Sequence, residues 1–152
     1  MATGKVDVIQ VVCNILRQRN LDVIDRAGKN GVGVIVRTVL ESGLLTGWYA
    51  PGHVFPGNDH RARYNSKKLA YALQTVEELR DIAVRAPYRT LAQVAIRFVL
   101  TAPGVSCIIL GAQSPDEVRE NLNALELPIL TREVVDELQT RYGWITEKVN
   151  FK

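Results

Sequence analysis

Glycines and hydroxyl side chains cluster at the end of a valine-rich apolar run. Residues 32–36 read VGVIV, and five residues of the turn that follows could contact a ligand: Thr38, Ser42, Gly43, Thr46 and Gly47. Glycine lets a backbone approach a ligand closely, and hydroxyls and exposed backbone N–H groups are suitable partners for a phosphate. The stretch 31–47 therefore predicts a phosphate-binding turn after a strand.

Gln10 is a second candidate, because it is the one uncharged polar residue of the apolar run 6–12, VDVIQVV. Its amide is either a satisfied core group or a group directed at a ligand beyond the end of a strand. His53 and His60 stand in a polar, glycine-rich loop without a second pair of ligands at a metal-binding spacing. We therefore expect surface histidines and no metal site.

Three strands and five helices must position these residues. Apolar runs predict strands at 6–12, 32–36 and 105–110, because parallel strands covered on both faces need no alternation. Helical spacing and caps predict helices at 21–29, 66–84, 91–102, 115–125 and 132–142, with no firm pattern in the tail 143–152. This alternation predicts one domain over residues 1–152, an all-parallel sheet covered by helices.

The stretch 48–65, WYAPGHVFPGNDHRARYN, separates the second strand from the next helix. It shows no helical period and follows the carboxyl end of a strand, where loops often carry function. Two interpretations stay open, a lid over a substrate or cofactor and a passive surface excursion. The basic residues lie closest together at Arg61, Arg63, Lys67 and Lys68. We interpret them as part of a solvated loop and of the start of a helix.

The composition is that of a globular domain. The chain has 152 residues, 47% of them apolar, and its 19 basic and 16 acidic residues are scattered, so the net charge of +3 forms no basic stripe for nucleic acid. The sequence has no apolar run of membrane-spanning length, and its first residues are not a cationic segment followed by an apolar one, as in a signal peptide. We therefore expect a cytoplasmic protein without nucleic-acid or membrane partners. Cys13 and Cys107 belong to different apolar runs, which predicts reduced, buried thiols.

Several segments together resemble the aldo-keto reductase family. LAQVAIRFVL, a proline-glycine turn and SCIILGAQSPDEVRENLNAL resemble its last third, and GVGVIVRTVLESGLLTG and VDVIQVVCN resemble the two strands before it. Family members close an eight-stranded βα barrel, and this chain resembles the sixth, seventh and eighth strands with their helices. The resemblance implies an α/β fold, a partial TIM-type barrel of three parallel strands with covering helices.

The family binds NADP or NAD, and the resemblance carries its contacts to particular residues. Gln10 matches the glutamine that hydrogen-bonds the nicotinamide carboxamide, and Arg37 falls where many members stack an aromatic ring on the nicotinamide. The turn around the pyrophosphate corresponds to Thr38, Leu40, Ser42, Gly43 and Leu44. The adenosine end corresponds to Gln113, Glu117 and Asn121.

Three of these positions depart from the family. Arg37 cannot stack as a large ring does, although its planar guanidinium can lie against one. Gln113 carries no charge where an arginine is common, and Glu117 could bring a carboxylate near a phosphate. Any preference for NADPH over NADH should therefore be weakened. Glu117 is also the capping-box acid of its helix, and this structural role alone could explain why a glutamate stands at position 117.

The family's catalytic groups are a tyrosine acid with a lysine, an aspartate and a histidine, all in the first half of the barrel. Nothing in this chain matches their motifs, so we expect no catalytic residue and an incomplete cofactor site, with the chain alone inactive as a carbonyl reductase.

Three interpretations follow. The chain is a reductase-like protein that needs another chain or is a gene remnant, a non-enzymatic assembly module like the reductase-like subunits of some channels, or a segment of a full-length reductase. Uncovered strand edges also predict self-association, a partner that supplies the missing strands, or helices rearranged over the open face.

Overall fold

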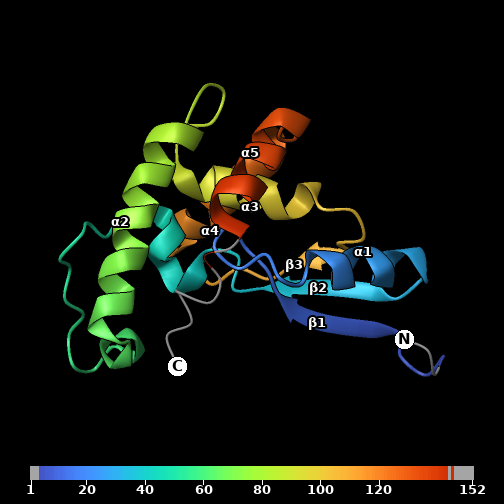
Figure 1. The fold of residues 1–152 in the computed structure, drawn as a ribbon, viewed down its shortest axis with the longest axis horizontal. Coiled ribbons are helices and arrows are strands. Elements are labelled where there is room, and N and C mark those ends of the chain that lie inside the picture. The colour runs from blue at the N-terminus through green and yellow to red at the C-terminus, as the bar shows by residue number, and fades with distance from the viewer. Residues whose placement is uncertain (1–3, 144, 146–152) are drawn as a thin grey trace.

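The computed structural model describes residues 4–143 and 145, and it contains a three-stranded parallel sheet at one side of the molecule, next to a group of helices (Figure 1). The strands lie in the order β1 (Val8–Val12), β2 (Gly33–Arg37) and β3 (Cys107–Ile108). The registers pair Gln10 with Ile35 and Ile35 with Cys107, so these three residues form a row across the sheet. The predicted α/β class and parallel topology are confirmed.

Helices form within a residue or two of their predicted positions. They are α1 (Leu21–Lys29), α2 (Ser66–Ala83), α3 (Leu91–Thr101), α4 (Pro115–Asn123) and α5 (Arg132–Tyr142), with short 3₁₀ helices η1 (Glu41–Thr46), η2 (His60–Arg63) and η3 (Ala124–Glu126). Thr90 and Gln93 make the predicted capping box of α3. Asn20 does not cap α1, because its side-chain amide donates to the Val12 carbonyl at 2.8 Å.

β1 and β3 are shorter than predicted, and one face of the sheet is exposed. β3 keeps two of the six predicted residues, and β2 is its one neighbour in the described sheet. Val8 is 54% exposed and Cys107 is also exposed, whereas Val34 and Val36 on the opposite face are buried. The expectation of cover on both faces was therefore wrong, as was the prediction that Cys107 is buried. Cys13 is buried as predicted.

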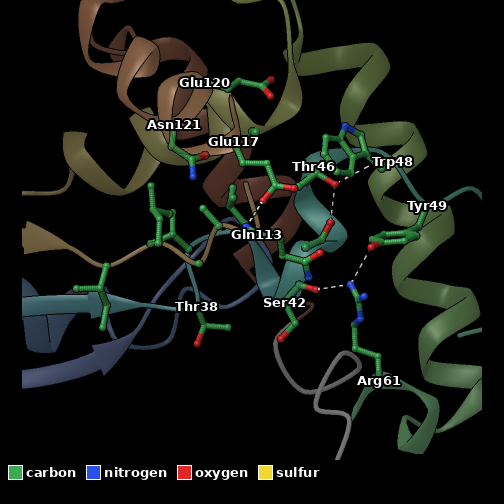
Figure 2. Close-up of a pocket in the computed structure, with 18 of the residues that line it drawn as sticks. Thr38, Ser42, Thr46, Trp48, Tyr49, Arg61, Gln113, Glu117, Glu120 and Asn121 are labelled. Atoms are coloured by element: carbon green, nitrogen blue, oxygen red, sulfur yellow. Dashed lines mark hydrogen bonds between the residues drawn. The ribbon is translucent and has the colours of Figure 1, made fainter. Parts of the chain in front are cut away.

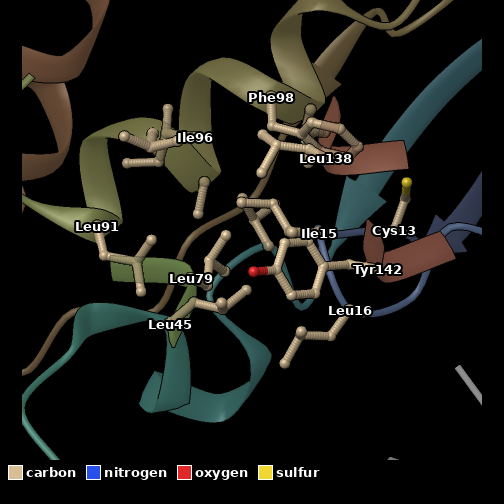
Figure 3. Close-up of a cluster of buried hydrophobic side chains, with 14 of the residues drawn as sticks. Cys13, Ile15, Leu16, Leu45, Leu79, Leu91, Ile96, Phe98, Leu138 and Tyr142 are labelled. Carbon is tan, nitrogen blue, oxygen red and sulfur yellow. The ribbon is translucent and has the colours of Figure 1, made fainter. Parts of the chain in front are cut away.

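The hydrophobic core lies on the other side of the sheet, among the helices (Figure 3). Leu45 of η1, Leu79 of α2, Phe98 of α3 and Leu138 of α5 are each at most 2% exposed. Burying such side chains supplies most of the energy that holds helices together in a protein. The core therefore fixes η1, which follows β2, against α2 and α3. None of the helices in the described part of the chain is long and apolar enough to cross a membrane.

Candidate functional site

The turn after β2 has an unusual backbone. Thr38, Glu41 and Ser42 adopt positive φ angles of 61°, 46° and 55°, and Gly43 follows at 88°. Non-glycine residues in this region are strained, and such strain persists where the surroundings enforce it. Here Asn14 enforces it, because its side-chain amide donates to the Thr38 carbonyl and to the Glu41 carboxylate, both at 2.8 Å. The predicted glycine and hydroxyl turn thus forms a fixed ledge at the end of β2.

Arg61 reaches this ledge from the long stretch 48–65. Its Nη1 donates to the Ser42 carbonyl at 2.9 Å and to the Tyr49 hydroxyl at 3.0 Å, and its guanidinium lies 4.2 Å from the centre of the Phe55 ring. A Cβ atom at Gly43 would lie 3.1 Å from the same Nη1. Close approach of Arg61, together with the positive φ angle, therefore explains the glycine at 43.

Asp59 holds Arg61 in place. The Arg61 Nη2 lies 2.6 Å from the Asp59 Oδ2, and the Arg61 side chain is 11% exposed. Hydrogen bonds from the Arg61 side chain and backbone N–H hold the pKa of Asp59 well below its usual range. The carboxylate in turn raises the pKa of Arg61, with a smaller contribution from Tyr49. The site therefore contains a positioned, permanently charged guanidinium.

A second set of polar groups comes from α4. Its N-cap Ser114 accepts a hydrogen bond from the Glu117 backbone N–H at 3.2 Å. The Glu117 carboxylate accepts a hydrogen bond from the Gln113 backbone N–H at 2.7 Å. In a capping box the donor would be the backbone N–H of the N-cap residue, Ser114, and Gln113 is the residue before it. One turn of α4 therefore presents a fixed carboxylate together with Glu120 and Asn121.

The ledge, the long stretch and α4 surround a cavity of about 440 Å³. Figure 2 shows Glu117, Glu120 and Asn121 on one side of it and Arg61, Ser42 and Thr38 on the other. A cation at one end fits a phosphate, and amide and carboxylate groups at the other end fit hydroxyl and amine donors. The arrangement can therefore bind an elongated molecule with an anionic part and a polar, uncharged part.

Most of the residues predicted for the site lie at this cavity. Seven line it: Thr38, Leu40, Ser42, Gly43, Gln113, Glu117 and Asn121. Three are not among its lining residues. Leu44 is fully buried in the core, whereas Gln10 and Arg37 are exposed on the open face of the sheet, and Arg37 donates to the Thr38 hydroxyl at 3.3 Å. The Thr46 hydroxyl donates to the Gly43 carbonyl at 2.7 Å.

Sequence reasoning left residues 48–65 open between a lid over a ligand and a passive surface excursion, and it named none of the residues that the stretch contributes to the cavity. Trp48, Tyr49, Asp59 and Arg61 all line the cavity, so this stretch is not a passive excursion. The interpretation of Arg61 as a solvated residue was wrong, because it pairs with Asp59 and packs on an aromatic ring. The available signal was the acid and arginine two residues apart in an aromatic-rich stretch. Glu120 was also missed, although it lies one turn from the predicted Glu117.

Comparison with known proteins gives a consistent result. The profile of the Aldo/keto reductase family matches residues 2–142. A probable voltage-gated potassium channel subunit beta from Oryza sativa subsp. japonica is 36% identical over 115 residues, which are 72% of this chain and 35% of that protein. An NADH-specific methylglyoxal reductase from Escherichia coli is 28% identical over 145 residues, which are 90% of this chain and 44% of that protein.

Solved structures agree on the fold. A glycerol dehydrogenase from Gluconobacter oxydans superposes with a TM-score of 0.73 at 25% sequence identity. The superposed region covers 89% of this chain and 42% of the dehydrogenase chain. An aldo-keto reductase from Bacillus halodurans gives a TM-score of 0.64 at 24% identity. The chain thus spans less than half of the length of these relatives.

Proposed function

Because the chain belongs to the aldo/keto reductase family, we propose that its cavity forms part of a nicotinamide-dinucleotide site for NAD(P)H-dependent carbonyl reduction. The single observation that carries this proposal is the pairing of Arg61 with the glycine-containing ledge at one end of a cavity whose other end is lined by Glu117 and Asn121. A dinucleotide has matching parts, a charged pyrophosphate and the hydroxyls and amine of adenosine.

The residues present fit that group at three places. Arg61 and the turn from Thr38 to Gly43 would hold the pyrophosphate, since a guanidinium pairs well with phosphate oxygens. Gln113, Glu117 and Asn121 would hold the adenosine half, as the family resemblance implies. Gln10 and Arg37 would meet the nicotinamide half. The two lie on the same face of the sheet, because Gln10 pairs with Ile35 and Arg37 is two residues further along β2.

The nicotinamide supplies the hydride when it is bound, and this chain would bind and orient it. The proton donor lies outside this chain in our proposal, because none of its tyrosines matches the family's catalytic motif. A positioned acid typically contributes ~10²- to 10⁴-fold to a rate. The chain alone is therefore proposed to be inactive, and the carbonyl reduction to need the catalytic half of a barrel.

Calorimetric titration with NADH and with NADPH tests the binding proposal. We expect heat from at least one nucleotide and a large loss of affinity in Arg61→Ala. Arg63→Ala is the matched control, since Arg63 is exposed two residues further on and does not line the cavity. Absence of heat with both nucleotides would leave the proposal without support. Turnover of aldehydes by this chain alone would contradict the proposed absence of a catalytic acid.

The exposed edges of the sheet support a partner. β1 and β3 each have one neighbouring strand in the described sheet, and Val8 and Ile109 are 54% and 49% exposed. Open parallel edges and apolar faces favour association. We propose that the chain self-associates or docks onto a chain that supplies the missing strands. A monodisperse monomer in light scattering, with no binding of a hydrophobic dye, would refute both options.

A non-enzymatic assembly module is the second candidate. Apolar residues form an exposed stripe at helical spacing on α4 and η3, with Val118, Leu122 and Leu125 46–57% exposed. Two relatives are named as probable voltage-gated potassium channel subunits beta, and these names support an assembly role as an alternative. Aldehyde reduction after addition of the missing barrel half would favour the enzyme over this module.

A cytoplasmic location is also proposed, because two free cysteines suit a reducing compartment. Cell fractionation tests this location.

A further inference from the structure

Arg37 places a positive charge at the carboxyl end of β2, on the open face of the sheet. Val34 and Val36 are buried on the opposite face, so the alternation of the strand turns the exposed Arg37 side chain outward. In the register, Val12 of β1 pairs with Arg37. On the other side, the Ile109 backbone N–H donates to the Val36 carbonyl at 2.9 Å. Arg37 therefore lies between two aliphatic residues in the sheet.

No acid in the surrounding part of the chain neutralises this charge. The loops that leave the carboxyl ends of the three strands are residues 13–18, 38–43 and 109–114. Together with the strands, they contain one acid, Glu41. Both Glu41 oxygens already accept hydrogen bonds from Arg17, and the Glu41 side chain is 1% exposed.

The Arg37 guanidinium itself is largely uncommitted. Among the described residues it forms no ion pair, and its hydrogen bond goes to the Thr38 hydroxyl at 3.3 Å. Most of its N–H donors are therefore available to a ligand.

This end of the sheet is where a βα barrel holds its active site. Thr38 follows Arg37 in the chain and Ile109 lies beside it in the sheet, and both line the cavity that we propose for the dinucleotide. Gln10 lies on the same open face, because it pairs with Ile35, two residues before Arg37. The guanidinium is therefore at the boundary between the cavity and the open face.

Completion of the barrel would change the surroundings of Arg37. The proposed function requires the missing strands to cover this face, which would take the guanidinium out of water. A guanidinium stays charged in proteins, and a buried cation without an anionic partner is strongly unfavourable. An anion is then needed beside Arg37, and the strands and loops around it supply none.

We propose that Arg37 binds an anionic group of the carbonyl substrate, so that the substrate class is an aldehyde or ketone with a carboxylate or phosphate close to its carbonyl. The inference rests on the proposed function, which puts the nicotinamide at Gln10 and Arg37. Carboxylate and phosphate oxygens match the planar fork of a guanidinium in paired hydrogen bonds. Such a pair would fix the orientation of the carbonyl beside the nicotinamide.

The pyrophosphate of the dinucleotide has a different cation in our proposal. Asp59 holds Arg61 against the Ser42 carbonyl, at the ledge. Arg37 instead precedes the ledge in the chain and lies on the face of the sheet. The two guanidinium groups are therefore placed to bind two different anions.

Calorimetry on the full chain, saturated with whichever of NADH and NADPH binds, tests the substrate class at low salt. Two pairs of probes that cannot be reduced are compared. Oxamate is matched with its neutral ester, ethyl oxamate, and phosphoglycolohydroxamate with glycolohydroxamate. We expect at least one anionic probe to bind about tenfold or more tightly than its neutral counterpart. The pair that shows this preference distinguishes a carboxylate substrate from a phosphorylated one.

Three variants assign the preference to a residue. R37Q should remove it, and should change the affinity for the anionic probe more than the affinity for the nucleotide. R37K should keep part of it, because an ammonium retains the charge but not the fork. R85Q is the control, since Arg85 is exposed between α2 and α3 and does not line the cavity. Circular dichroism verifies that each variant folds.

The outcomes separate this inference from the proposed function. Nucleotide binding with equal affinity for the two members of each pair, or with no binding of any probe, would overturn the substrate class and leave the nucleotide site standing. A preference that persists in R37Q would overturn the role of Arg37, as would a loss confined to nucleotide affinity. Binding of neither NADH nor NADPH would contradict the proposed function and this inference with it.

Discussion

The guanidinium of Arg17 and the carboxylate of Glu41 form a two-pronged ion pair across 24 residues of sequence. Nε lies 2.7 Å from Oε2 and Nη2 lies 2.8 Å from Oε1. Glu41 is 1% exposed and also accepts a hydrogen bond from Asn14. The pair joins the loop after β1 to the turn after β2, so it supports the ledge from below.

Glu41→Gln should destabilise the fold by about 3 kcal/mol, because it removes the buried carboxylate charge that pairs with the Arg17 guanidinium. This is the low end of the range for buried pairs, since Arg17 keeps 21% of its side chain exposed. Urea unfolding followed by circular dichroism measures the difference.

Glu137→Gln is the control for that substitution. It breaks the exposed pair of Glu137 with Arg141 and should change the stability by less than about 1 kcal/mol. Equal effects of the two substitutions would contradict the structural role of the buried pair.

Gly28→Ala should also destabilise the protein, although alanine is favoured over glycine in a helix by about 1 kcal/mol. A Cβ atom at Gly28 would lie 2.5 Å from the Cα atom of Gly104, so α1 would have to move away from the turn before β3. Overpacking of this kind typically costs ~1–3 kcal/mol. Gly57→Ala, with no atom within 4 Å of the added carbon, should be close to neutral. Thermal unfolding of both variants checks the expected order, and a more stable Gly28→Ala would contradict the close packing.

The two cysteines should react at very different rates. Burial raises the pKa of Cys13 to about 12, and its side chain is inaccessible, whereas Cys107 is exposed on β3. Because the thiolate is the reactive form, native protein at pH 8 should bind one equivalent of a thiol reagent quickly, and unfolded protein two. Cys107→Ser should abolish the fast reaction. Fast labelling of Cys13 in that variant would show that the core opens readily.

Asp59→Asn should destabilise the protein in a pH-dependent way. Hydrogen bonds from Arg61 lower the pKa of Asp59 in the folded state, so its contribution is fully present above the unfolded pKa of about 3.9 and is lost as the pH falls toward the folded value. The difference between the natural protein and the variant should therefore be large at pH 7 and shrink below about pH 4.

Urea midpoints at pH 7 and pH 3 measure this difference. Asp136→Asn removes an exposed partner of Arg132 and should have little effect at either pH. A constant penalty for Asp59→Asn at both pH values would contradict the electrostatic role of Asp59.

The sequence predicted helices better than strand lengths, because helix signals are local. Thr90 and Ser114 mark helix starts through bonds to residues three positions later. The length of β3 instead depends on its neighbours, and pairing with β2 alone leaves it two residues long. The exposure of Cys107 has the same origin, since an apolar run gives no information about what covers it.

In the candidate site, too, residues with a local sequence signal could be predicted, and residues placed by distant contacts could not. The turn around Ser42 could be predicted from its glycines and hydroxyls, and the α4 residues from the family resemblance. Arg61 could not, because its burial depends on the carbonyl of Ser42, 19 residues earlier, and on an aromatic ring of the same stretch. Such contacts arise only once the chain has folded back on itself.

The strained turn after β2 has a consequence for the thermodynamics of binding. Thr38, Glu41 and Ser42 are held at positive φ angles by Asn14 and Arg17, through contacts that involve no ligand. A molecule that binds there meets a backbone already ordered, so association loses little conformational entropy at this wall. The binding free energy should therefore lack the ordering penalty that a flexible turn would add, while the loss of rigid-body freedom and the desolvation of polar groups remain.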